Sequence, residues 1–402
     1  MIKSIKLTNF LSFGNEQDEI ELRPLNIIIG TNGSGKSNFL EAFDLLQNLP
    51  SNIGLPIREG GNVSDWLYKG SHNNNPDASL DVVINNPLII ARRHDDLRYT
   101  ISFNGSWFVD GINITEEKLA SKEPLHEKNE PYIYYQLKNR ELIVNVQNSD
   151  LEADSQYKTL RSGEIDTTQS ILAQKRDTFY YPEMTMLALN FSQIRLYRDW
   201  QFGRYTPPRL RQKADMLNQY LEPDCSNLGL VLNQIEMNPT AKTRLLKELQ
   251  YFYKDVENFG VSISNNTVQI YFREFGLKSS VPATRLSDGT LRYLCLLAIL
   301  CNPYLPPLVC IEEPELGLHP DVFPGLVKLL REVSERCQLI ITTHSEAFVD
   351  LFTDDPESIM VAEKSENGTQ LARLNKEQLK PWLEKYRLGN LWTRGDIGGT
   401  RW

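Results

Sequence analysis

The octet Gly30-Thr31-Asn32-Gly33-Ser34-Gly35-Lys36-Ser37 has the residue types and the spacing of a loop that binds polyphosphate. Its glycines permit backbone angles and close approaches that a Cβ would block, so successive N–H groups can converge on one phosphate. Lys36 would reach the β- and γ-phosphates, and the Ser37 hydroxyl would complete one Mg²⁺ coordination position. The residues expected at the nucleotide are Asn32, Gly33, Ser34, Gly35, Lys36, Ser37 and Asn38.

The segments on either side of this loop support the same interpretation. Residues 25–29 are mostly β-branched and predict a buried parallel strand, and residues 38–49 predict a helix. The N-terminus of that helix would add the positive end of its dipole to the phosphate site. A glycine-rich turn that binds nothing is the alternative, and the strand–loop–helix context disfavours it.

Composition limits the class of protein. The chain has 402 residues, of which 41% are hydrophobic and 24% charged, as in a soluble globular protein of two or three domains. No apolar run approaches the roughly 18 residues that span a bilayer, so we expect a cytoplasmic protein with no membrane partner. Five cysteines without C-x-x-C spacing predict neither a disulfide framework nor a zinc site. A net charge of −9 argues against a surface coated in basic residues.

Two adjacent acids are the candidates for the second half of the site. Glu312 and Glu313 follow the apolar run 308–311, which predicts a strand that ends in carboxylates. Glu312 would hold Mg²⁺, directly or through water, and Glu313 would orient or deprotonate the attacking water. An ordinary strand ending in solvated acids is the alternative. Because Lys36 and Glu312 are far more than one βαβ unit apart, the chain must return to the site after a large insertion.

Two further motifs flank the acids. The phrase from Arg285 to Arg292 opens an apolar helix, and the buried run 339–343 delivers His344. Taken singly both are weak, because Ser-Asp-Gly is often only a helix cap and a lone histidine is more often packed or on the surface. Their order after the phosphate loop resembles ABC-type ATPases, with the signature motif first and the switch histidine last. The resemblance implies that Ser287 and Gly289 bind the γ-phosphate of a nucleotide held by a partner subunit.

Three phrases narrow the resemblance. Residues 6–13, 286–292 and 312–320 look like the RecF/OLD/SMC branch of ABC ATPases, and more narrowly like the stand-alone AAA_21-type "predicted ATPase" proteins of bacteria, often placed in defence loci. The resemblance covers nearly the whole chain. It implies an α/β ABC-ATPase head that uses ATP and Mg²⁺ and forms a homodimer around two ATP molecules. Glu312 stands where most ABC proteins have Asp, and Asp288 where they have Gly. Both departures occur in this narrower branch, so ATP binding is still implied, and we expect turnover to be slow.

The glutamine that senses the metal in ABC proteins has two candidates. Gln193 lies at the end of the run 187–191 and is the first choice, and Gln136 competes with it. A plain surface glutamine is an equally good interpretation of either residue.

The pattern of elements predicts three segments. Residues 1–200 form ATPase lobe I, with the phosphate loop and an antiparallel β insertion whose strands are 80–84, 98–103, 132–137 and 141–146. Residues 201–258 form a helical insertion, with helices near 209–221, 226–237 and 241–256. Residues 259–402 form lobe II, with the signature motif, the acidic strand and the histidine in a parallel sheet.

One segment is a candidate for contact with DNA. Residues 195–213 interleave arginines with aromatic residues, a pattern that can track phosphates and stack on bases. The alternative is that the aromatics pack into the core and the arginines are solvated.

The partner expected from the resemblance is a separate protein. The chain after His344 has no D-x-D cluster and is too short for the Toprim nuclease module of OLD-type proteins, so we expect no nuclease in this chain. The leading hypothesis is an ATP-gated sensor or regulator of a separate nuclease or Toprim-type effector, in anti-phage defence. A RecF-like DNA-repair ATPase is the alternative. The nucleotide-binding subunit of a transporter fits poorly with the large insertion.

Overall fold

The computed structural model describes residues 2–15, 18–70, 77–86, 96–105, 111–124, 130–145, 157–160 and 165–399. It contains two compact units. The first holds the chain up to Ile194, the segment Ile359–Leu374 and the described end of the chain from Ile397, and the second holds Arg195–Ser358 and Asn375–Asp396. Both units are therefore discontinuous in sequence, whereas the three segments expected from the sequence are continuous.

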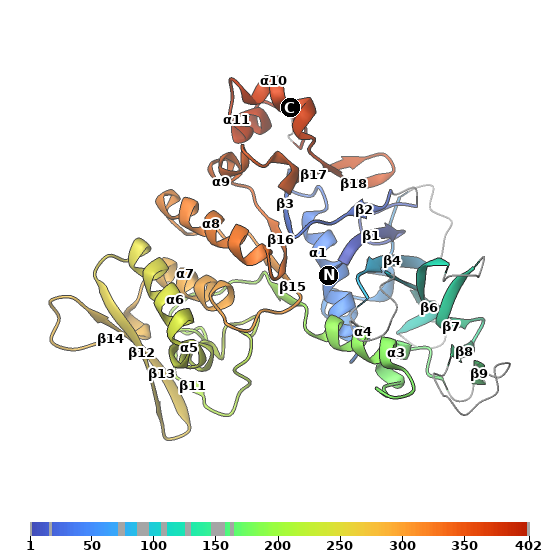
Figure 1. Ribbon diagram of the computed structural model, residues 1–402, viewed down its shortest axis with the longest axis horizontal. Helices are drawn as coiled ribbons and strands as arrows, with labels where there is room; N and C mark the ends of the chain where they lie inside the picture. The colour runs from blue at the N-terminus through green and yellow to red at the C-terminus, as the bar shows by residue number, and fades with distance from the viewer. Residues whose placement is uncertain are drawn as a thin grey trace. The chain divides into compact units, whose positions relative to one another are not determined.

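A large antiparallel sheet occupies the first unit (Figure 1). Every second residue along β5 is buried, namely Leu97, Tyr99, Ile101 and Phe103, which is the alternation of a strand with one face on a core. The predicted antiparallel strands are confirmed, although Val146 lies outside the described residues. The strands, in spatial order, are β2 (Ile20–Glu21), β1 (Ile2–Thr8), β4 (Ala78–Ile84), β5 (Leu97–Gly105), β6 (Ile112–Pro124), β7 (Pro131–Lys138), β8 (Glu141–Asn145) and β9 (Tyr157–Leu160).

The phosphate loop belongs to a second group of strands in the same unit. β3 (Leu25–Gly30) is buried along its whole length and runs parallel to β17 (Ile359–Ser365), which pairs antiparallel with β18 (Gly368–Arg373). Continuous burial is what an apolar parallel strand requires, so the predicted strand is confirmed. The helices of this unit are α1 (Lys36–Asn48), α2 (Gly54–Glu59), α3 (Ile171–Gln174) and α4 (Pro182–Ser192).

The second unit contains the predicted parallel strands of the C-terminal half. β15 (Leu308–Glu312) lies between β10 (Arg195–Tyr197) and β16 (Gln338–Thr342), and all three are parallel. Because parallel strands end at the same edge, the residues that follow β15 and β16 are brought together. From residue 288 onward, the α-helices of this unit are α7 (Asp288–Leu300), α8 (Phe323–Ser334), α9 (Glu346–Val349), α10 (Lys376–Leu383) and α11 (Leu388–Thr393).

The helices of the predicted insertion, residues 201–258, pack against a hairpin that lies mostly after it in the sequence. α5 (Leu228–Met237) and α6 (Pro239–Phe252) pack against the hairpin of β12 (Val256–Ser264) and β13 (Thr267–Glu274), seen in yellow in Figure 1. β11 (Gln212–Lys213) and β14 (Val281–Pro282) pair with β13. The helices expected near 226–237 and 241–256 are confirmed.

The prediction of a helix near residues 209–221 is wrong. The segment forms turns and the short strand β11 instead. Gln212 shows the physical reason, because its side-chain oxygen accepts a hydrogen bond from the Gly229 N–H at 2.6 Å and ties the segment to α5. Such tertiary contacts override a local helical pattern.

Within the described residues, none of the helices has both the length and the apolar character needed to cross a membrane.

Candidate nucleotide-binding and catalytic site

The phosphate loop joins the end of β3 to the first residue of α1. A Cβ at Gly30 would lie 2.4 Å from the Ala362 carbonyl oxygen, and one at Gly35 would lie 2.2 Å from the Thr369 hydroxyl. Gly35 also has a φ of 100°, which L side chains rarely adopt. Glycine is therefore required at both positions by the close approach of β17 and β18.

The loop offers groups that would suit the phosphates of a nucleoside triphosphate. Gly35 occupies the N-cap position of α1 and gives no side-chain cap, so the first-turn N–H groups are left for an anion. The Lys36 ammonium is held 2.9 Å from the carbonyl oxygens of both Gly30 and Thr31, over the loop. Ser34 is buried and its hydroxyl has no hydrogen-bond partner within the described chain. Asn32 and Ser37 are exposed.

Thr369 and Ser12, which were not predicted from the sequence, support the phosphate loop through hydrogen bonds. The Thr369 hydroxyl donates to the Ser34 carbonyl oxygen at 2.9 Å and lies 2.7 Å from the Ser12 hydroxyl. The Thr369 N–H also donates to the Ser12 carbonyl oxygen at 2.7 Å. Ser12 lies within the N-terminal phrase that carries the family resemblance, and this phrase was the available signal.

The paired acids lie where β15 ends. Glu312 is in register with Thr342 of β16. Glu313 follows with a φ of 47°, a left-handed conformation that is costly for a residue with a side chain. Its N–H donates to the Thr342 carbonyl oxygen at 3.0 Å, and its carbonyl oxygen accepts from the Arg292 guanidinium at 2.6 Å. Neighbouring elements therefore hold Glu313 in a strained geometry, which an ordinary solvated strand end would not show.

His344 lies beside Glu313. Its Nε2 is 3.5 Å from the Glu313 Oε1, and the two side chains are 35% and 30% exposed. The structure thus brings together two of the residues predicted from separate motifs. A carboxylate and an imidazole at this distance can share a proton or orient one water molecule.

Glu315 supports the histidine and was missed by sequence reasoning. Its side chain is buried, and its Oε1 accepts hydrogen bonds from the Thr343 hydroxyl and, at 3.4 Å, from the His344 N–H. Burial raises the pKa of this carboxyl. A third acid in the phrase Glu-Glu-Pro-Glu was the only signal of it.

Arg292 and Trp200 hold the peptides of the acid pair and were also missed. The Trp200 Nε1 donates to the Glu312 carbonyl oxygen at 3.1 Å. The Arg292 guanidinium, on α7, lies 5.0 Å from the centroid of the Trp200 ring and 5.9 Å from that of Phe202. Arg292 is buried, and this burial lowers the pKa of its guanidinium. Both carbonyls of the acid pair are therefore held by donors that stack on each other.

Replacing Arg292 by methionine is expected to lower kcat for ATP hydrolysis by about 10- to 100-fold, because a misplaced catalytic group costs about this much. Nucleotide affinity should change by less than about threefold, since the loop that carries Lys36 belongs to the other unit. Steady-state hydrolysis and nucleotide titration separate the two quantities. Arg292→Lys should recover part of kcat, and Arg244→Met, which removes a surface pair with Glu332, serves as the control. An unchanged kcat for Arg292→Met would rule out this positioning role.

The signature motif begins α7. Ser287 is the N-cap of the helix, and its hydroxyl accepts from the Thr290 N–H at 3.0 Å. Gly289 lies in the first turn, where a Cβ would come within 3.1 Å of the Gly317 carbonyl oxygen. Ser287 is exposed and Gly289 is half-buried.

The basic segment 195–213 is largely an internal element. Tyr197, Trp200 and Phe202 stack in sequence, with ring centroids 6.0 and 5.9 Å apart. The Arg195 guanidinium covers the Tyr220 ring at 4.9 Å, and Arg209 is buried. These residues have partners inside the protein, as the core-packing alternative predicts, and DNA contact by the rest of the segment stays a prediction. The exposed basic residues of the segment are Arg204, Arg211 and Lys213.

Both glutamine candidates for metal sensing belong to the first unit. Gln193 is the C-cap residue of α4 and is half-buried. Gln136 lies in β7, and its side-chain amide donates to Glu116 Oε1 at 3.2 Å. This contact favours a structural role for Gln136, and metal sensing by Gln193 stays a prediction.

The donors available for Mg²⁺ fit an ion that is bound mainly through phosphates. Within the described residues, no group of three or more His, Cys, Asp or Glu side chains forms a metal site. Mg²⁺ in nucleotide sites typically takes one or two protein oxygens beside the phosphates and water. The oxygens expected from the sequence are the Ser37 hydroxyl, in the first unit, and the Glu312 carboxylate, in the second, and their binding of Mg²⁺ stays a prediction.

The glycine-lined loop between β3 and α1 and the acid pair after β15 define a P-loop ATPase of the ABC and SMC-like type. Solved structures share this fold. An Smc head bound to the C-winged helix domain of ScpA is 13% identical and has a TM-score of 0.57, with 94% of this chain and 99% of that chain covered. An Smc head from Pyrococcus furiosus bound to the C-terminal domain of ScpA is 12% identical and has a TM-score of 0.53, with 96% and 98% covered.

The AAA_21 family model, described as "AAA domain, putative AbiEii toxin, Type IV TA system", matches residues 25–350. The chain belongs to this family. It is also similar to a protein of Helicobacter pylori named "ATP/GTP phosphatase", with 22% identity over 386 residues that cover 87% of each chain.

Proposed function

We propose that this protein binds ATP between two copies of the chain, hydrolyses it slowly, and thereby regulates a separate effector protein in anti-phage defence. The observation that carries the catalytic part is Glu313, whose strained peptide is held from both sides and whose carboxylate lies beside His344. The name of the Helicobacter pylori relative supports hydrolysis of a nucleoside triphosphate.

The residues have distinct roles in this proposal. The N–H groups of the phosphate loop, from Asn32 to Asn38, and the Lys36 ammonium bind the phosphates. Ser37 and Glu312, with Gln193 as a candidate for sensing, would hold Mg²⁺, which neutralises phosphate charge when bound. Glu313 accepts the proton of the attacking water, and His344 orients the γ-phosphate. Ser287 and Gly289 of a second copy complete the site.

A regulated partner is supported by the family description and by one fold neighbour. The family description names a toxin of a toxin–antitoxin system, which suits a defence role. One Smc head is described as bound to a domain of another protein, ScpA. A head of the same fold that changes oligomeric state with ATP could control an effector by the same kind of docking.

Light scattering after size exclusion tests the proposal. The chain should elute as a monomer without nucleotide and as a dimer with ATP and Mg²⁺. Co-expression with the neighbouring genes should then retain one gene product in an ATP-dependent manner. A chain that stays monomeric with every nucleotide would reject the dimer, and retention of no neighbour in any nucleotide state would reject the effector.

Direct binding of DNA, as in RecF-like repair, is the second candidate. Arg204, Arg211 and Lys213 are exposed, together with Tyr205, whose side chain could stack on a base. Neutral substitutions of Arg211 and Lys213 would remove salt-dependent DNA binding if this candidate is right.

A further inference from the structure

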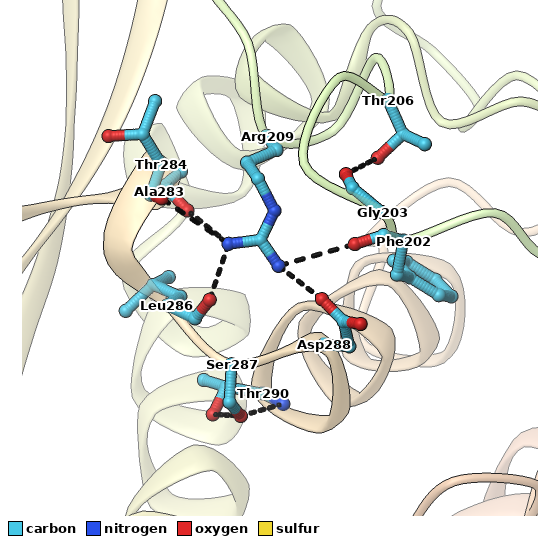
Figure 2. A network of polar contacts seen from close by, with 10 residues as sticks. All are labelled: Phe202, Gly203, Thr206, Arg209, Ala283, Thr284, Leu286, Ser287, Asp288 and Thr290. Atoms are coloured by element: carbon cyan, nitrogen blue, oxygen red, sulfur yellow. Dashed lines mark hydrogen bonds and ion pairs between the residues drawn. The ribbon is translucent and has the colours of Figure 1, made fainter.

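Arg209 lies inside the second unit with its guanidinium against the start of α7 (Figure 2). Its Nη1 donates to the Leu286 carbonyl oxygen at 2.5 Å and, more weakly, to those of Thr284 at 3.4 Å and Ala283 at 3.5 Å. Its Nη2 donates to the Phe202 carbonyl oxygen at 3.2 Å and to the Asp288 carboxylate at 2.5 Å. The residue is 7% exposed. This buried arginine therefore connects several parts of the loop that leads into the signature motif through hydrogen bonds.

The backbone contacts of Arg209 set where α7 begins. The segment Ala283–Arg285 is a single 3-10 turn, and Leu286 then turns the chain into the helix. The Ala283 carbonyl accepts from the Leu286 N–H at 3.2 Å, but the carbonyl groups at the end of so short a turn have no following turn to bond, and leaving them unpaired in a buried place is costly. Because one rigid planar guanidinium binds several of them, it fixes the direction from which Ser287 enters the helix.

The contact with Asp288 has an electrostatic consequence. Asp288 is the first residue of α7, and its side chain is 69% exposed. A carboxylate suits a helix N-terminus by itself, but it repels a phosphate that approaches the same N–H groups. The ion pair with Arg209 offsets this negative charge.

We propose that Arg209 is a positioning residue for the ATP-bound dimer, which orients the signature loop and neutralises Asp288 so that the N-terminus of α7 can accept the γ-phosphate of a nucleotide on a second copy. This inference rests on the proposed dimer and adds a residue to it. It also assigns Arg209 a role inside the protein in place of contact with DNA. Asp288 adds a negative charge that Arg209 neutralises, whereas a glycine at position 288 would leave Arg209 only its contacts with the carbonyl groups.

A double-mutant cycle in the Glu313→Gln background tests the charge. Arg209→Met should weaken ATP-dependent dimerisation by about tenfold or more, as expected for exposing one like charge to a phosphate. Asp288→Gly alone should change it by less than about threefold, and adding it to Arg209→Met should restore the part of the loss that comes from the exposed carboxylate, while the part that comes from the lost carbonyl contacts remains. Binding of a fluorescent ATP analogue to the monomer should stay within about twofold in all variants, because the phosphate loop is untouched.

Hydrogen exchange of the nucleotide-free protein tests the positioning without any dimer. Arg209→Met should speed exchange of the Leu286, Thr290 and Leu291 amides by about tenfold, and Arg209→Lys should recover part of the protection. Arg244→Met, on the surface of the same unit, is the control.

Several results would overturn the inference. They are unchanged dimerisation of Arg209→Met, a loss of dimerisation on Asp288→Gly alone, or unchanged exchange of the signature loop. If Arg209→Met does not fold, Arg209→Lys and Asp288→Gly carry the test: faster exchange of the signature loop in Arg209→Lys, with a strong dimer in Asp288→Gly, supports the inference, and parental exchange in Arg209→Lys or loss of the dimer in Asp288→Gly rejects it. If the Glu313→Gln parent shows no ATP-dependent dimer, the proposed function fails, and the exchange experiment still decides whether Arg209 positions the loop.

Discussion

Replacement of Glu313 by glutamine is expected to lower kcat for ATP hydrolysis by at least about a hundredfold, because general-base catalysis contributes roughly 10²- to 10⁴-fold. Glutamine has nearly the same size, so the Thr342 and Arg292 contacts to the peptide of residue 313 should remain. Glutamine cannot accept a proton from water. ATP should therefore bind with near-parental affinity and persist in the site, and the dimer that forms around it should accumulate.

Single-turnover hydrolysis and light scattering of the same samples measure the two halves of this result. Glu335→Gln, an exposed acid in the same unit, is the matched control and should behave as the parent. Hydrolysis at the parental rate would show that Glu313 is not the base. Slow hydrolysis without a dimer would support the catalytic role of Glu313 and reject the ATP-bound dimer.

Replacement of Lys36 by alanine is expected to weaken ATP binding by about a hundredfold or more, equivalent to about 2.8 kcal/mol. The ammonium is the positive side chain that the loop itself carries, and charge-assisted hydrogen bonds to phosphate are among the stronger polar contacts. The carbonyl oxygens of Gly30 and Thr31 would also lose a donor that holds the loop in shape.

Calorimetric titration with ATP and Mg²⁺ measures this effect. Lys69→Ala, which removes an exposed lysine of the same unit that pairs with Asp65, is the control and should bind ATP normally. The Lys36 variant should also fail to dimerise, unlike the Glu313 variant. Parental affinity of Lys36→Ala would contradict the assignment of the loop as the phosphate site.

The parts of the site that follow from local sequence were predictable. Glycine at positions 30 and 35, the apolar strand before them and the helix after them are encoded within some twenty residues, and the structure has each of them. Glu313 and His344 were found in the same way, because apolar strands that end in functional residues have a local pattern. Hydrophobic periodicity also predicted the antiparallel strands of the first unit.

The supporting residues were not predictable, because their partners are distant in sequence. Trp200 contacts Glu312, and Arg209 contacts Leu286 and Asp288, across long stretches of intervening chain. From the sequence alone, the segment that holds Trp200 and Arg209 had the composition of a DNA-binding stretch. The same composition suits a segment packed inside the protein, since arginine and tryptophan side chains can also donate hydrogen bonds to buried carbonyl groups.

The sequence by itself determined the nucleotide-binding loop, the acid pair, the signature motif and the family, because each depends on residue types at short fixed spacings. Only the tertiary structure decided how Glu313 is held, since its left-handed peptide is stabilised by Thr342 and Arg292 from other elements. It also decided that Arg209 faces the signature loop. Burial makes the difference, because a guanidinium out of water must find its acceptors wherever the fold places them.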